Sequence, residues 1–159
     1  NLAQVKNVTL TYHPPKKKIP LIKLDLDKTR QVIMNLADNA VHYSAPPSGG
    51  GRADVYLELE NDEAVFKVVD NGIGVPDDIK PKFFAKFFRA SNAQSARPDG
   101  TGLGLYLVKR VVEDQGGSLI FESQVGKGST FGFRMPIHNK LKVDKEAVKR
   151  LQSAQNPKN

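Results

Sequence analysis

The sequence predicts a single domain of mixed helices and strands, because two hairpin patterns and two amphipathic helix patterns occur along its 159 residues. A chain of this length can bury one substantial core. Hydrophobic residues make up 39% and charged residues 26%, which is ordinary for a globular protein. The chain has no cysteine, so disulfides and thiolate metal sites are excluded.

The first half predicts one strand, one extended segment and one long helix. Alternation predicts a strand over Val8–Tyr12 and extended backbone over Ile19–Leu26. Asp27 is a suitable N-cap for a helix of about four turns that reaches Val41 or His42. The loop Ser44–Gly51, rich in proline and glycine, follows. The expected apolar face of the helix is Val32, Ile33, Leu36, Ala40 and Val41, and the expected polar face is Gln31, Asn35, Asp38, Asn39 and His42.

The second half predicts two hairpins around a helix. Val55–Glu60 and Glu63–Val69 flank Asn61-Asp62, a pair suited to a tight turn. Leu103–Gln115 is an amphipathic helix that Gly116-Gly117 ends. The other expected elements are a short helix over Asp77–Phe88, a polar loop over Arg89–Gly100, a closing hairpin of Ser118–Gln124 with Thr130–Pro136, and a terminal helix over Lys142–Gln152.

Two glycine-rich loops are the most informative local feature. Asp70-Asn71-Gly72-Ile73-Gly74 follows an apolar strand pattern, and Gly100-Thr101-Gly102-Leu103-Gly104 precedes a helix pattern. Glycine permits positive φ and a close approach of backbone to ligand. A glycine loop that opens a helix also directs free N–H groups at an anion, usually a phosphate. Two such loops in one chain favour a ligand that carries phosphate.

Three polar side chains are candidates for ligand contacts. Asn35 and Asn39 are four residues apart, so both carboxamides leave one helix face, where their oxygens suit Mg²⁺. Two exposed asparagines on a helix are also common without any function. Asp70 is either an ordinary turn residue or an acceptor for the exocyclic amine of adenine, with Gly72 and Gly74 making room for the base.

The net charge of +7 does not predict nucleic-acid binding. Much of it lies in Lys16-Lys17-Lys18 and in Lys140–Lys149, and no nucleic-acid-binding motif accompanies it. No apolar run approaches the length of a membrane span, and no signal peptide is visible. Since the chain begins with Asn1, we expect an excised fragment, with a domain over 1–138 and a polar, basic tail over 139–159.

Five motifs in order resemble the catalytic ATP-binding domain of sensor histidine kinases. They are Asn-Leu-Ala-Asp-Asn-Ala, Asp-Asn-Gly-Ile-Gly, Phe-Phe-Ala-Lys-Phe-Phe-Arg, Gly-Thr-Gly-Leu-Gly-Leu and Gly-Lys-Gly-Ser-Thr-Phe, and the resemblance covers roughly Leu21 to Ile137. It implies an α+β fold, a two-layer α/β sandwich with a mixed sheet and helices on one face. It also implies transfer of the γ-phosphoryl group of ATP to a histidine on a separate dimerisation domain, with a response regulator downstream. The domain would be cytoplasmic, in a parent protein that can be membrane-anchored.

The resemblance assigns roles residue by residue. Asn35 and Asn39 would face Mg²⁺ and the phosphates, Tyr43 would pack on adenine, and Asp70 would read its amine. Arg89 would be the lid cation that reaches the γ-phosphate. The remaining candidates for the ATP site are Gly72, Ile73 and Gly74 at the base, Gly100, Thr101, Gly102, Leu103 and Gly104 at the phosphates, and Thr130 near adenine.

The chain departs from the family pattern at His42, where many relatives have lysine or arginine. As a phosphate contact it would add charge only when protonated, at mildly acidic pH. Phe83, Phe84, Phe87 and Phe88 are interpreted equally well as anchors of the lid or as ligand contacts.

The acceptor histidine is missing from the sequence pattern. None of His13, His42 and His138 matches the family's phosphorylated motif, so the chain resembles a catalytic half without its substrate helix. Three alternatives remain open: an ATPase of the same fold, a serine kinase of the same fold, and a nucleotide-binding module without transfer activity. Asn35 disfavours the ATPase, because the ATPase relatives carry a glutamate as general base there.

Overall fold

A five-stranded mixed sheet forms one layer of the domain, in a computed structural model that describes residues 2–44, 50–96 and 100–137. Its strands are β1 (Val8–His13), β2 (Gly51–Glu60), β3 (Glu63–Asp70), β4 (Ser118–Gln124) and β5 (Gly128–Pro136). The strand order is β1-β2-β3-β5-β4. β1 is parallel to β2, and every other neighbouring pair is antiparallel.

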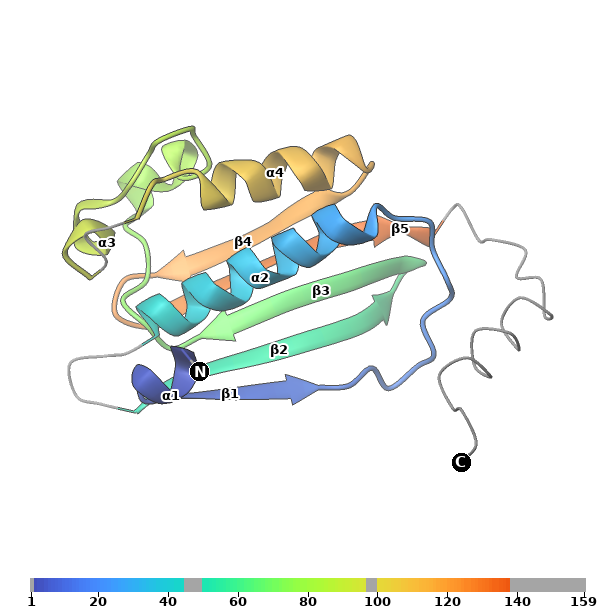
Figure 1. Ribbon diagram of the computed structural model, residues 1–159, viewed down its shortest axis with the longest axis horizontal. Coiled ribbons are helices and arrows are strands. Elements are labelled where there is room, and N and C mark those ends of the chain that lie inside the picture. Colours follow the sequence, from blue (N-terminus) through green and yellow to red (C-terminus); the bar gives the residue numbers. More distant parts are fainter. Residues whose placement is uncertain (1, 45–49, 97–99, 138–159) are drawn as a thin grey trace, which may run out of the picture.

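Two helices form the second layer. α2 (Leu26–Tyr43) lies over the centre of the sheet, and α4 (Gly104–Asp114) lies beside it over β4, on the same face (Figure 1). Three short helices complete the fold: α1 (Leu2–Val5), the 3₁₀ helix η1 (Asp77–Lys82) and α3 (Ser91–Ala96). The predicted two-layer α+β sandwich with a mixed sheet is confirmed.

The core lies between the two helices and the sheet. Leu36 of α2, Val108 and Val112 of α4, and Val68 of β3 are all at most 1% exposed. The rings of Phe66 and Phe133 stack 5.4 Å apart across β3 and β5. Alternate residues of these strands therefore point at the helices, and this alternation decides which side chains can reach a site between the layers.

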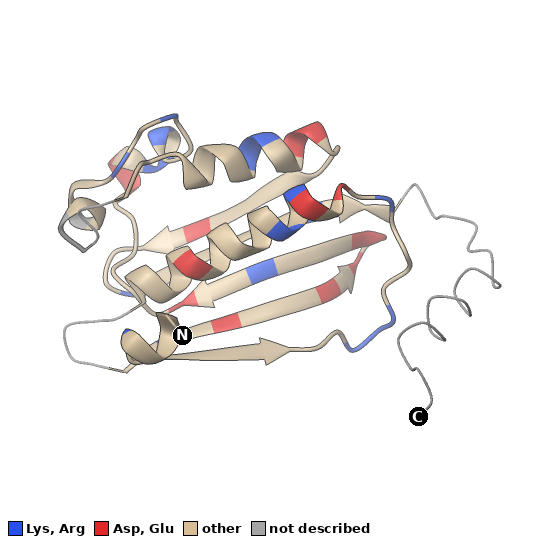
Figure 2. Cartoon of the chain, viewed as in Figure 1, with Lys and Arg blue, Asp and Glu red and all other residues tan. Residues whose placement is uncertain are grey.

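The other face of the sheet is polar. Lys67 contacts Glu58 at 2.6 Å, and Arg134 contacts Glu60 at 2.9 Å. Acidic and basic residues are interspersed over α2, α4 and the central strands rather than gathered by sign (Figure 2). Within the described ranges no helix is long and apolar enough to cross a membrane.

Several predicted element boundaries were wrong. α2 is capped by Asp25, whose carboxylate accepts the Lys28 N–H at 3.0 Å, whereas Asp27 lies inside the first turn. The predicted extended segment Ile19–Leu26 has only an isolated bridge at Ile22, in the connection from β1 to α2, and Leu26 is already the first residue of α2. The predicted loop Arg89–Gly100 contains α3, and the helix predicted over Asp77–Phe88 is a 3₁₀ helix that ends at Lys82.

Other predicted elements agree closely or lie outside the described residues. α4 matches its predicted range within one residue at each end, and both hairpins are present. β2 begins at Gly51, inside the predicted loop, and α1 was not predicted. The predicted tail 139–159 and its terminal helix lie outside the described residues.

Candidate functional site

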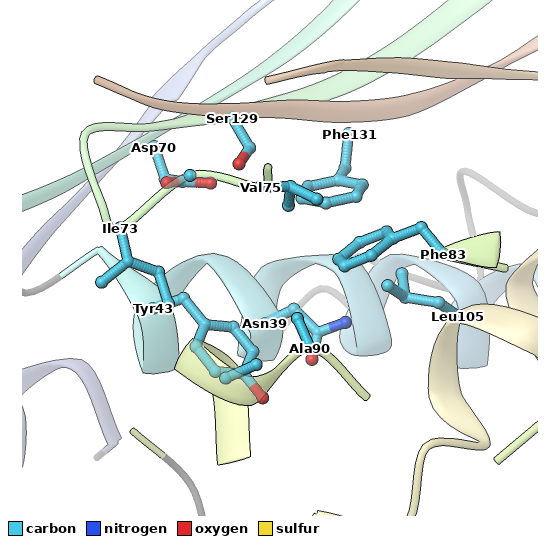
Figure 3. Close-up of a pocket in the computed structure, with 12 residues that line it drawn as sticks. Asn39, Tyr43, Asp70, Ile73, Val75, Phe83, Ala90, Leu105, Ser129 and Phe131 are labelled. Carbon is cyan, nitrogen blue, oxygen red and sulfur yellow. The ribbon is translucent and has the colours of Figure 1, made fainter. Parts of the chain in front are cut away.

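A cleft lies between the carboxyl-terminal half of α2, the loop after β3 and the start of α4. It consists of two adjoining cavities, which share the lining residues Asn39, Tyr43, Phe83, Ala90, Ala93 and Leu105. We call them the apolar end and the polar end. Figure 3 shows the apolar end, with α2 on one side and side chains from the sheet opposite. We call residues 90–96, which include α3, the lid segment, and its Ala90 and Ala93 line both ends.

The apolar end has one acid among its described lining residues, Asp70. Asp70 stands at the end of β3 and is 7% exposed. Burial raises the pKa of Asp70 to about 6, although hydrogen bonds from the backbone N–H groups of Gly72 and Ser129 act in the opposite direction. The Gly72 N–H donates to Asp70 Oδ1 at a distance of 2.9 Å. The walls around this carboxyl are Tyr43, Ile73, Val75, Phe83, Leu105 and Phe131.

The loop after β3 owes its glycines to packing against neighbouring backbone. A Cβ on Gly72 would collide with the carbonyl of Tyr43, at the end of α2. Gly74 has φ +64°, and a Cβ there would collide with the carbonyl of Gln124. The Ile73 N–H also donates to the Tyr43 carbonyl at 3.1 Å. The predicted reason, room for a base, is therefore not needed to explain these glycines, and only Gly74 lines the cavity.

The polar end presents carboxamides from one ridge of α2. Gln31, Asn35 and Asn39 line it at four-residue spacing. Asn35 Nδ2 donates to the Gln31 carbonyl at 3.0 Å, so its Oδ1 is left to face α4. A Cβ on Gly104 would lie 3.0 Å from that oxygen. The missing Cβ keeps this space open beside a hard oxygen donor, and the donor set fits Mg²⁺.

The opposite wall of the polar end is the second glycine loop and the start of α4. Leu103 is the N-cap and offers no side-chain oxygen. The first intrahelical bond runs from the Leu107 N–H to the Leu103 carbonyl, at 2.9 Å. The N–H groups at this helix end are therefore available to an anion, which the positive end of the helix dipole also favours.

Arg89 brings a positive charge to the same end. Its guanidinium lies against Gly100, where a Cβ would be 2.9 Å from Nη2. Nη2 also donates to the Ala93 carbonyl of α3 at 3.4 Å. The cation thus lines the polar end while it contacts the lid segment.

The phenylalanines around the lid are mainly anchors. Phe83 stacks on Phe121 at 5.1 Å and on Phe131 at 5.9 Å, and Phe84 and Phe88 meet Phe83 edge-on. Phe83 also lines both ends of the cleft, so for this residue the two interpretations are compatible. Phe87 differs: it is 64% exposed, has φ +63°, and donates its N–H to the Gly102 carbonyl.

Most of the predicted site residues meet in this cleft, and three do not line it. Those that line it are Asn35, Asn39, Tyr43, Asp70, Ile73, Gly74, Arg89, Gly100, Thr101, Gly102, Leu103 and Gly104. Gly72 lines neither end and packs against the Tyr43 carbonyl. His42 precedes Tyr43 on α2, with its ring 6.5 Å from the ring of Tyr43, and does not line either end.

Thr130 is replaced in the cleft by its neighbour Ser129. Ser129 is opposite Asp70 in the register of β3 and β5, whereas Thr130 is opposite Val69 and points to the other face. The sequence contained the signal for this: Phe131 and Phe133 alternate towards the core, so Ser129 shares their face. Gln31, Ala90 and Ala93 also line the cleft without having been predicted to.

A family model matches residues 24–139, and its description is "Histidine kinase-, DNA gyrase B-, and HSP90-like ATPase". The chain belongs to this family. Within it the chain is similar to sensor histidine kinases. It is 37% identical over 121 residues to the circadian input-output histidine kinase CikA of Synechococcus elongatus. It is 31% identical over 129 residues to the sensor protein SrrB of Staphylococcus aureus.

Those alignments cover 75% and 81% of this chain but only 15% and 21% of the two relatives. Among solved structures, the mycobacterial sensor histidine kinase MprB aligns with a TM-score of 0.71 at 25% identity, over 85% of this chain and 88% of that one. Full-length ShkA in complex with AMPPNP aligns with a TM-score of 0.70 at 27% identity, over 85% of this chain and 27% of that one. This is the catalytic ATPase-type domain of the histidine kinase family.

Proposed function

We propose that the domain binds Mg²⁺-ATP in the cleft and transfers the γ-phosphoryl group to a histidine on a separate dimerisation domain, as part of two-component signalling. The observation that carries the proposal is that one cleft has two chemically different ends. The apolar end holds a single buried carboxyl, and the polar end gathers amide oxygens, a guanidinium and a helix N-terminus. A nucleoside triphosphate has the matching two halves.

At the apolar end the ligand would be adenine. Asp70 accepts hydrogen bonds and has no proton to give when ionised, so it fits the exocyclic amine of the base. Tyr43, Ile73 and Val75 offer apolar surface to the faces of a flat ring. The solved complex of full-length ShkA with AMPPNP, an ATP analogue, supports a nucleotide as the ligand of this family's domain.

At the polar end the ligand would be the phosphates with their metal. The amides of Gly100–Gly104 and the start of α4 would bind phosphate oxygens, and Arg89 would neutralise charge near the γ-phosphate. Asn35 and Asn39 would hold Mg²⁺, which completes its shell with phosphates and water and neutralises the charge that builds up during transfer. Asn35 Oδ1 would not need to turn, because Nδ2 already bonds Gln31.

The polar end favours transfer over hydrolysis. Among its described lining residues there is no aspartate or glutamate to act as general base for water. The acceptor would instead come from the dimerisation domain of the same kinase, and a response regulator would receive the phosphoryl group afterwards. We place this domain in the cytoplasm, without nucleic-acid or membrane contacts.

Binding and transfer are tested separately. Calorimetry should detect ATP binding by the wild type that strengthens when Mg²⁺ is added. In Asn35→Ala, Mg²⁺ should strengthen ATP binding only slightly. Added to a dimerisation domain that carries a histidine followed by an acid and a basic-Thr-Pro segment, the wild-type chain should place acid-labile phosphate on that histidine. Absence of nucleotide binding by the wild type would refute the proposal as a whole. Binding without transfer to any such domain would leave only a nucleotide-binding module.

A further inference from the structure

Ser123 of β4 lies behind the apolar end of the cleft and does not line it. Its hydroxyl nevertheless contacts both walls of that end. Ser123 Oγ accepts the N–H of Val75 at 2.8 Å and lies 2.8 Å from Ser129 Oγ. It also donates to the Gly128 carbonyl at 3.1 Å. Val75 and Ser129 both line the cavity, and they are 6% and 7% exposed.

These three contacts determine the direction of the Ser129 hydroxyl. A serine hydroxyl has one hydrogen and two lone pairs. Since the Val75 N–H can only donate and the Gly128 carbonyl can only accept, Ser123 must give its hydrogen to Gly128. The contact with Ser129 is then satisfied only if Ser129 donates to Ser123. The free lone pair of Ser129 Oγ is left for the cavity, beside the carboxyl of Asp70 (Figure 3).

We propose that Ser123 is a positioning residue that makes the cleft selective for adenine over guanine, by holding Ser129 as a second hydrogen-bond acceptor next to Asp70. Two acceptors match the two hydrogens of the adenine amine. Guanine carries a carbonyl oxygen at the same ring position, and this oxygen would face two acceptors without a proton between them. This inference rests on the proposed binding of a purine nucleotide and adds the residue that determines which purine is bound.

The surrounding structure allows the hydroxyl to be removed without loss of the loop. The Gly126 N–H donates to the Ile73 carbonyl at 3.0 Å, and Lys80 Nζ donates to the backbone carbonyl of Ser123 at 2.5 Å. Both bonds persist in Ser123→Ala, because neither uses the hydroxyl. Ser123→Thr keeps the hydroxyl. Ser118→Ala is a matched control, because it removes a hydroxyl from the exposed, opposite end of the same strand.

The test measures dissociation constants for Mg²⁺-ATP and Mg²⁺-GTP by calorimetry, with thermal melts of each variant. We expect the wild type to prefer ATP. In Ser123→Ala the ATP affinity should fall about tenfold, the size of one lost hydrogen bond, while GTP affinity does not fall. The ratio of the two affinities should therefore drop about tenfold. Ser123→Thr and Ser118→Ala should keep the wild-type ratio.

Other outcomes would overturn the proposal. It is wrong if the wild type binds ATP and GTP equally, or if Ser123→Ala weakens both by the same factor. Either result leaves nucleotide binding, and so the proposed function, intact. If Ser123→Ala does not fold, Ser129→Ala decides, because it removes the acceptor itself and should lower the ATP-to-GTP ratio by a similar factor. An unchanged ratio in Ser129→Ala would refute the role of the oriented hydroxyl.

Discussion

Asp70 lies at a position where its charge opposes folding. Its pKa is raised from 3.8 to about 6 by burial, so the native state keeps the proton to a higher pH than the unfolded chain does. The native state therefore binds more protons between these values, and stability falls as the pH rises through this window. Above pH 6 the full cost of the buried charge is present.

Replacing Asp70 by asparagine should therefore separate stability from function. Without nucleotide, Asp70→Asn should raise the free energy of unfolding at pH 7.5, by up to about 3 kcal/mol if the whole pKa shift is recovered. At pH 5, which lies between the two pKa values, the gain should be about half as large. ATP affinity should fall by about 1.5–3 kcal/mol, the range for a hydrogen bond to a charged group. Urea denaturation at both pH values and calorimetry measure these changes, and Asp78→Asn is an exposed control. A destabilised variant at pH 7.5 would contradict the burial argument.

The pH dependence of binding distinguishes Asp70 from His42. Protonation of Asp70 removes the charged acceptor, so ATP affinity should fall as the pH is lowered through about 6. A phosphate contact by His42 would have the opposite effect, because protonation would add a positive charge. Since His42 does not line the cleft, we expect the Asp70 behaviour and a near wild-type profile for His42→Ala. Affinity that rises at acidic pH, and no longer does so in His42→Ala, would show that His42 contacts the phosphates.

The metal assignment is tested at Asn39. This residue is on the cleft-facing ridge of α2, where truncation to alanine does not reduce helix propensity. Asn39→Ala should keep the wild-type melting temperature without nucleotide and lose the part of ATP affinity that depends on Mg²⁺. Titration of ATP with and without Mg²⁺ measures that part. A collapse of the melting temperature would instead identify Asn39 as a structural residue.

At the residue scale, sequence predicted chemistry better than it predicted orientation. Amide, carboxyl and glycine positions were recognisable from type and spacing, because helix spacing places Asn35 and Asn39 on one face. Ser129 lines the cleft and Thr130 does not, although the alternation of Phe131 and Phe133 already places Ser129 on the core face; what the sequence did not show is that the register sets Ser129 opposite Asp70. The reason for Gly72 was also hidden, since the Tyr43 carbonyl that excludes a side chain there comes from a different element.

At the scale of elements, Gln115 connects the end of α4 to the start of α2. Its Oε1 accepts the Asp25 N–H at 2.8 Å, and Nε2 donates to the Val111 carbonyl at 3.3 Å. Gln115→Ala should destabilise the domain by about 0.5–1.5 kcal/mol, the net value of one hydrogen bond. Urea denaturation measures the loss, with Arg110→Ala as a control for an exposed residue of α4. Equal stability of the two variants would show that the bond contributes nothing.

The same contact explains part of what local sequence reasoning missed. Asp25 and Asp27 are both suitable N-caps by type, and Gln115, 90 positions away in sequence, lies against Asp25. α4 was predicted within one residue because its signals are local: an amphipathic period and the pair Gly116-Gly117. α3 has six residues and no apolar period, so nothing in its sequence distinguished it from a loop.

The lid segment should respond to nucleotide. α3 has only six residues, and its Gln94 Nε2 donates to the Arg89 carbonyl at 3.2 Å, close to it in sequence. Such an element opens locally at low free energy. Contacts from Arg89 and the second glycine loop to phosphate should stabilise its closed state. Hydrogen exchange over residues 90–96 and 100–104 should slow with a non-hydrolysable ATP analogue, while residues 107–112 change little. Unchanged exchange in the lid would contradict this role.

At the scale of the whole molecule, the order of the strands was beyond local prediction. Each hairpin could be recognised from its own turn. The pairing of β3 with β5 joins the two hairpins, and β1 pairs in parallel with β2, although α2 separates these two strands in the sequence. These pairings bring Asp70 and Ser129 together at one end of the sheet. The resemblance to a known family supplied the sandwich that the local patterns alone did not determine.

The arrangement of the described histidines indicates where the phosphoryl group cannot go within this chain. His13 lies on the face of the sheet opposite α2 and α4, where its Nε2 contacts Asp54 at 2.9 Å and its ring stacks on Tyr56. His42 is on α2 but outside the cleft lining. Transfer requires an acceptor nitrogen in line with the γ-phosphate. Incubated alone with Mg²⁺-ATP, the chain should therefore carry no stoichiometric acid-labile phosphate on His13, His42 or His138, as mass spectrometry would measure. Phosphate should appear only on an added acceptor helix, and stoichiometric modification of any of the three would show that the acceptor lies within the chain.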